Sequence, residues 1–190
     1  YIAYFNRAPD ALGLNFWGNA FSNGTTLEGM AKYFIDQEET REIYSALASN
    51  LDFATAVYNN VLGRIPDQAG LSFWVDLLNR EEVTGVSRDQ FILEVLRGVQ
   101  DGSPDSNYLD QKVDLGIYYS VTKGLSDLDN AIRIMDIYNG TEASLVAAKV
   151  AIDSIYEAAL DPDNGEFMLH VSGQLIDPFF LGWLIHYFDG

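Results

Sequence analysis

Residues 7–17 read RAPDALGLNFW, and residues 64–74 read RIPDQAGLSFW. Both fit the pattern R-x-P-D-x-x-G-L-x-F-W, and a tyrosine (Tyr1 or Tyr58) stands six residues before each arginine. Identities kept at one spacing over this length indicate a tandem duplication. We name the two stretches the first and the second copy. They decide the fold, because the local structure that they encode is built twice.

The copied pattern predicts a helix end followed at once by a helix start. A residue that precedes proline is disfavoured in a helix, so one helix should end near Arg7 and another near Arg64. The next helix then begins after Asp10 or Asp67, whose carboxylate can accept hydrogen bonds from free backbone N–H groups. Because this cap accounts for both aspartates, we prefer it to a calcium-ligand role. For the arginines we expect helix-end carbonyls or an acidic neighbour as partners, rather than an anionic ligand.

Glycine and tryptophan recur at the same places in the helix that follows the cap. Gly13 and Gly70 cost about 1 kcal/mol each relative to alanine, so a close neighbour is expected at both. Trp17 and Trp74 each stand three residues after a leucine, which puts both side chains on one helical face. We expect these tryptophans, with the phenylalanines before them, to pack in the core. The alternative is that they stack on sugar rings.

The rest of the chain up to residue 160 also favours helix. Residues 25–28 (TTLE) and 87–90 (SRDQ) fit the S/T-x-x-E/Q capping box, which should start the second helix of each unit. Further helices are expected over residues 108–122, 128–138 and 142–160, separated by glycine-containing segments that stop one helix and cap the next.

These segments define the organisation that we predict. The chain is mainly α: a helical bundle built from two duplicated helix-pair units plus a further helical segment. A short C-terminal appendage follows, for which strand and helix both stay open. The predicted parts are the first unit (1–50), the second unit (51–104), the further helical segment (105–160) and an acidic, aromatic tail (161–190).

The charge of the chain is strongly negative, with 28 Asp and Glu residues against 11 Lys and Arg and a net charge of −17. Such a surface repels phosphate backbones, so we exclude nucleic acid as a partner. The longest apolar run, residues 178–188, is too short to span a bilayer, so no transmembrane segment is expected. The chain has no cysteine and opens on Tyr1 without a signal peptide. We therefore expect a fragment of a secreted protein that does not depend on disulfides.

The start of the tail is the candidate calcium site. Oxygen-bearing side chains cluster there around a turn, at Asp161, Asp163, Asn164 and Glu166. Calcium prefers such oxygen ligands, but the glycine is out of place for an EF-hand loop and the final bidentate glutamate is missing. We therefore prefer a metal-free turn, with Ca²⁺ as the candidate ion.

The end of the tail is the candidate partner surface. Four of its aromatic residues are Phe179, Phe180, Trp183 and Tyr187. If exposed, such a cluster would bind a ligand or a partner.

Residues for catalysis are scarce. The only histidines are His170 and His186, there is no cysteine, and neither histidine lies in a G-x-S-x-G or H-E-x-x-H motif. Carboxylates that could form a glycosidase pair are abundant, but nothing singles out one pair. We expect the protein not to be an enzyme.

The copied pattern resembles the signature of a bacterial helical module, the domain of unknown function 4214, in which R-x-P-D-x-x-G-x-x-x-W precedes a serine-led helix. That module is in turn similar to phycobilisome linker domains. The resemblance covers roughly residues 1–100 as two units. It implies a place in large secreted bacterial proteins, beside calcium-binding glycine-rich (RTX) repeats, surface-layer regions or adhesin parts. It implies no enzymatic chemistry.

We therefore expect a non-catalytic module of a secreted or cell-surface bacterial protein that mediates assembly, adhesion or matrix attachment, with calcium as an aid. Its partner would be a protein or a glycan at the cell surface, self-association included. Two alternatives stay open: a carbohydrate-binding module attached to an extracellular enzyme, and the C-terminal export region of a type I secreted protein.

Overall fold

The computed structural model of the chain describes residues 1–45, 48–161, 163, 165 and 168–169. Within these residues every regular element is a helix and no strand occurs, which confirms the mainly α prediction. The rest of the predicted tail, with Phe179, Phe180, Trp183 and Tyr187, lies outside the described residues.

Eight α-helices belong to the part of the chain that contains the two copies. Those around the first copy are α1 (Ile2–Phe5), α2 (Ala11–Ser22), α3 (Leu27–Ile35) and α4 (Glu38–Ile43). Those around the second copy are α5 (Asn50–Leu62), α6 (Gln68–Asn79), α7 (Glu81–Thr84) and α8 (Arg88–Arg97). The predicted boundary after residue 50 therefore falls in the first turn of α5.

The further helical segment contains α9 (Pro104–Ile117), which continues into a π-helix (Tyr118–Thr122), then α10 (Leu128–Ile137) and α11 (Glu142–Ala159). The last two agree with the predicted 128–138 and 142–160 to within one residue. By contrast, α9 starts before the expected residue 108, because Ser103 caps it and a proline occupies its first turn. The predicted boundary after residue 104 thus falls within the first turn of α9.

The two copies share one hydrophobic core instead of building two. Phe34 of α3 lies in the same buried cluster as Phe53 of α5 and Phe91 of α8. The most extensive helix–helix contact in the described structure joins α3 to α8, one helix from each unit. The two predicted units are therefore halves of a single packed body.

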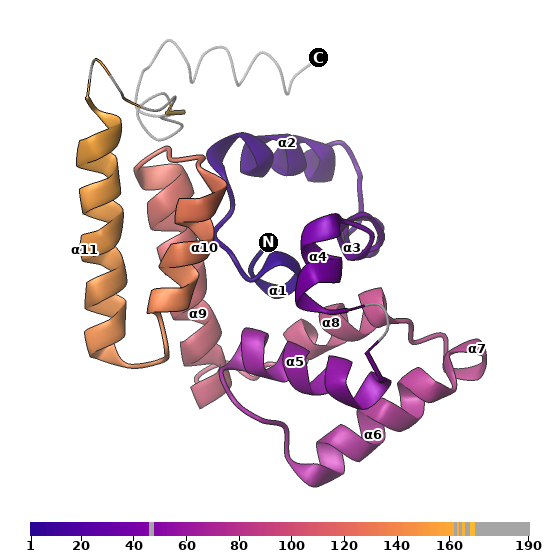
Figure 1. The fold of residues 1–190 in the computed structure, drawn as a ribbon. Coiled ribbons are helices and arrows are strands. Elements are labelled where there is room, and N and C mark those ends of the chain that lie inside the picture. The colour runs from indigo at the N-terminus through magenta and orange to yellow at the C-terminus, as the bar shows by residue number, and fades with distance from the viewer. Residues whose placement is uncertain (46–47, 162, 164, 166–167, 170–190) are drawn as a thin grey trace.

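A second core lies between α9, α10 and α11, which stand side by side at the left of Figure 1. Leu115, Ile134 and Ile152 are fully buried in it, one from each of these helices. α9 joins the two cores, because it also contacts α1 and α5. Ala8, in the first copy, is buried in the second core. The first copy thus bridges both halves of the molecule.

Both predicted capping boxes are wrong in their details. Thr26, and not Thr25, is the N-cap of α3, and its hydroxyl accepts from the Gly29 N–H at 3.1 Å. Ser87 is the N-cap of α8, but its hydroxyl donates to the carboxylate of Asp89 instead of accepting from the helix. At Ser87 a nearby carboxylate, and not the helix backbone, is the partner of the hydroxyl.

Candidate functional site

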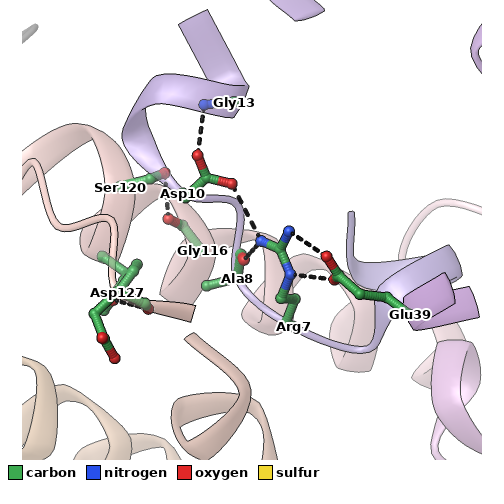
Figure 2. A network of polar contacts seen from close by, with 9 residues as sticks. Arg7, Ala8, Asp10, Gly13, Glu39, Gly116, Ser120 and Asp127 are labelled. Carbon is green, nitrogen blue, oxygen red and sulfur yellow. Dashed lines mark hydrogen bonds and ion pairs between the residues drawn. The ribbon is translucent and has the colours of Figure 1, made fainter. Parts of the chain in front are cut away.

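The first copy is centred on a buried arginine (Figure 2). The Nε of Arg7 donates to Glu39 at 2.7 Å, and its Nη1 donates to the Ala8 carbonyl at 3.0 Å and to Asp10 at 3.3 Å. Burial disfavours the charge of Arg7, but the hydrogen bond and the charge of Glu39 outweigh it and raise the pKa of Arg7. The guanidinium is therefore engaged by the protein itself, and it ties the first copy to α4.

The second copy repeats this arrangement with a different partner. Arg64 donates from Nε and Nη2 to the two carboxylate oxygens of Asp105, each at 2.7 Å. The side chain of Arg64 is 43% exposed, whereas that of Arg7 is 5% exposed. Glu39 and Asp105 lie outside the copied stretches, yet each is the second residue of a later helix, α4 or α9. Each copy is thus attached to a helix further along the chain.

The aspartates cap their helices in both copies. Asp10 accepts from the Gly13 N–H at 2.6 Å, and Asp67 accepts from the Gly70 N–H at 2.8 Å. The bond from Gly70 lowers the pKa of Asp67. A methyl group at Gly13 would overlap the Tyr1 hydroxyl, so the first glycine does have the close neighbour that its presence suggested.

The copied tryptophans pack against the shared core, but the phenylalanines before them do not. The rings of Trp17 and Phe34 lie 4.9 Å apart, and the Trp74 Nε1 donates to Tyr58 at 2.9 Å. By contrast, Phe16 is 64% exposed and its counterpart Phe73 is 58% exposed. The expectation that these phenylalanines pack in the core is wrong, because each lies on the outward side of its helix.

An apolar groove lies beside the Arg7 network, between α1, α2, α3, α8 and α9. Its volume is about 370 Å³. Leu14 of α2, Met30 of α3, Leu96 of α8 and Val113 of α9 all line it, and none of its lining residues is charged. A groove of this size and chemistry is typical of a site that receives apolar groups of a ligand or partner.

The helix α2 is unusual in having no charged residue along its whole length. Only Ala11 of α2 is buried, while Leu12, Phe16 and Phe21 are each more than half exposed. Asn15 and Asn19, which α2 also exposes, are polar but uncharged. Next to the groove, α2 therefore adds exposed apolar side chains of the kind that mark an interaction site.

Acidic residues border the groove. Arg97, next to the lining residue Leu96, pairs with both Glu28 of α3 and Glu94 of α8. Asp110 and Asp114 directly follow the lining residues of α9 and are exposed. Within the described part of the chain neither of these two aspartates forms an ion pair. Lys32, which is exposed and follows the lining residue Ala31, also lies at this border, so four acids face two bases and the border is net negative.

The predicted calcium site is only partly described. The N–H of Asp163 donates to the Asp161 carboxylate at 2.9 Å, as in a turn that needs no metal. Asn164 and Glu166 lie outside the described residues. Among the residues that the structure describes, no group of three or more acidic or histidine side chains could hold a metal ion. None of the helices that the structure describes has both the length and the apolar composition of a membrane span.

The sequence interpretation missed the groove. Its lining residues come from five helices, and α9, which supplies one wall, follows both copies in the sequence. One signal was present, since residues 11–22 contain no charged side chain in a chain where 21% of residues are charged.

Comparison with known proteins gives one match, over the central part of the chain. The searches of curated proteins and of solved structures gave no match. A family model matches a range that begins inside α3 and ends directly after α8, so it contains the second copy and not the first. Residues 31–98 match the model of the family described as domain of unknown function (DUF4214), the family that the copied pattern resembles.

Proposed function

We propose that this chain is a non-catalytic protein-binding module whose groove receives an apolar segment of a partner. The observation that carries the proposal is the groove itself, an uncharged space of about 370 Å³ that adjoins the exposed apolar helix α2. Burying such surfaces against a partner is favourable by roughly 25 cal/mol per Å² of apolar area. The lack of cysteine and the presence of only two histidines in the chain support binding over catalysis.

The wider setting belongs to the same proposal. Both copies are units of the matched family, and the parent is a secreted or cell-surface bacterial protein in which this module mediates assembly, adhesion or matrix attachment. The net charge of −17 and the lack of cysteine support an extracellular setting. Calcium would aid association by screening the acidic surface.

Selection of a random peptide display library on the immobilised protein tests this function. We expect peptides that bind the wild type and lose binding to Leu14→Asp and to Val113→Asp, because each variant places a charge in the groove. Leu12→Asp is the matched control, since Leu12 lies in α2, is 51% exposed and does not line the groove. Peptides that bind all four proteins equally would exclude the groove as the binding site.

Glycan binding is the second candidate, and one observation favours it. The ring of Trp17 lies 5.3 Å from that of Phe16 and 5.8 Å from that of Tyr33, and Tyr33 is 62% exposed. Exposed aromatic rings can stack on sugars. If glycans are the ligand, the wild type and Leu14→Asp should both bind on a glycan array, and Tyr33→Ala should not bind. Binding lost only in Leu14→Asp would instead assign the ligand to the groove.

The export alternative concerns residues 161–190, of which only Asp161, Asp163, Gly165, Met168 and Leu169 are described. Deleting this tail and measuring secretion of the parent protein tests it. Normal secretion without the tail would exclude an export role.

A further inference from the structure

Resting on the proposed function, we infer that the segment that enters the groove is an amphipathic α-helix of a partner protein, with basic residues beside its apolar face. The inference draws on the shape of the groove, on the polar groups that its lining lacks, and on the charges at its border.

Two helices line the groove with regular stripes of apolar residues. On α3 the lining residues Leu27, Met30 and Phe34 follow the spacing i, i+3, i+7. On α9 the lining residues Leu109, Val113 and Ile117 follow i, i+4, i+8. Each stripe covers about two turns, or about 10–12 Å at 1.5 Å per residue. An apolar stripe on a docked helix has the same spacing and length.

The lining favours a helix over an extended segment. Tyr1 and Tyr4 supply the only polar side-chain atoms among the lining residues, and the Tyr4 hydroxyl already donates to the Asp89 carbonyl at 2.7 Å. An extended segment buried here would leave its backbone N–H and C=O groups without partners, which is costly. A helix satisfies these groups internally. No sheet edge exists in the described residues to pair with an added strand.

The border charges select a basic helix. Glu28 and Glu94 share the single cation Arg97, and Asp110 and Asp114 have no ion-pair partner among the described residues. Lys or Arg residues beside the apolar face of the docked helix would complement these carboxylates, whereas Glu residues would be repelled. Attraction between exposed charges also weakens in salt.

Isothermal titration of the full chain with three synthetic peptides tests the inference. The first has apolar residues at i, i+3, i+4 and i+7 with flanking lysines. The second carries glutamate for each lysine, and the third has two central prolines that prevent helix formation. We expect the lysine peptide to bind roughly tenfold more tightly than the glutamate peptide, since several exposed charge contacts change sign. The proline peptide should not bind.

Two double variants locate the effect on the protein. Asp110→Asn with Asp114→Asn should reduce the preference for the lysine peptide. Glu81→Gln with Glu82→Gln removes the same charge from α7, none of whose residues lines the groove, and should leave the preference unchanged. Leu14→Asp should abolish binding. Equal binding of the lysine and glutamate peptides, or of the proline peptide, would overturn the inference, as would self-association of the chain that Leu14→Asp prevents.

The outcome can be separated from that of the proposed function. Display selection could yield groove-dependent peptides that are acidic or cannot form helices. That result would support the proposed binding function and overturn the inference of a basic helix. If selection yields no groove-dependent peptide, both are overturned.

Discussion

The ammonium group of Lys112, in α9, donates to the side-chain oxygen of Asn6 at 2.9 Å, so a helix of the second core holds the end of α1. Asn6 is the only non-glycine residue in the described chain with a left-handed backbone, at φ 44°. The same ammonium donates to the Asn60 carbonyl of α5 at 2.8 Å. One buried cation therefore joins the two units and the further helical segment.

Burial of Lys112 should appear in the pH dependence of stability. Desolvation lowers the pKa of Lys112 from 10.5 to about 8, with Asp136 opposing the shift. A lowered pKa means that the unfolded chain binds the proton more tightly, so between pH 8 and 10.5 the free energy of unfolding rises with pH. From pH 7 to about 9.5 the wild type should gain roughly 2 kcal/mol relative to Lys112→Met.

Urea unfolding at several pH values measures this gain. Lys149→Met, which removes an exposed lysine of α11, is the control and should show a constant difference from the wild type. Burial raises the pKa of Tyr4 and that of Tyr44, which lowers stability above pH 10, so the series ends below that point. A constant difference for Lys112→Met as well would show that Lys112 is not desolvated.

The two copied arginines should differ in their contribution to stability. Arg7→Ala removes a buried guanidinium and leaves Asp10 and Glu39 without their partner, at a cost of about 3 kcal/mol. Arg64→Ala removes a more exposed pair and should cost less than about 1 kcal/mol. Thermal or urea unfolding of both variants gives the comparison. Equal losses would mean that burial of the pair is irrelevant.

The copied glycines should respond in opposite ways to alanine. In Gly13→Ala the methyl group meets the Tyr1 hydroxyl, and overpacking of this kind costs about 1–3 kcal/mol. In Gly70→Ala the nearest atom is an oxygen of the exposed Asp67, at 3.3 Å. That carboxylate can shift, so the helix propensity of alanine should make this change neutral or stabilising by up to about 1 kcal/mol. The difference in unfolding midpoint between the two variants decides the prediction.

Calcium should act through the overall charge and not through a site in the tail. At equal ionic strength we expect calcium and magnesium to raise the unfolding midpoint equally, because both screen a net charge of −17. Calcium could instead raise the midpoint more than magnesium does, and lose that advantage in Asp161→Asn with Asp163→Asn. That result would contradict this prediction and support a calcium site at the start of the tail. Calorimetric scans with each chloride salt provide the measurement.

Interactions between residues close in the sequence made much of the fold predictable. Asp10 and Asp67 accept from the N–H groups of the predicted helices because a proline stop and a short carboxylate leave few other conformations. The helices near 128–138 and 142–160 follow from glycine and capping residues in the same way. At the start of α8 the Ser87 hydroxyl can bond either to the helix backbone or to the Asp89 carboxylate. The sequence does not reveal which partner it takes.

Long-range packing made the rest unpredictable. The groove depends on how α9 lies against α3 and α8, and the spacing of Leu109 and Val113 indicates a helical face without naming its neighbour. Likewise, the position of Phe16 next to Trp17 does not reveal which of the two side chains points outward. Only the absence of charge in α2 hinted at a surface for a partner.

The arginine of each copy donates to the second residue of a later helix, Glu39 of α4 or Asp105 of α9, and this gives the duplication a direction. A copied stretch cannot complete its own contacts, because its acceptor comes from a helix further along the chain. A longer array of such units would therefore grow toward its C-terminus and need a closing helix there with an acid at that position. In this chain α9 is such a terminator, much as an end cap completes a repeat protein.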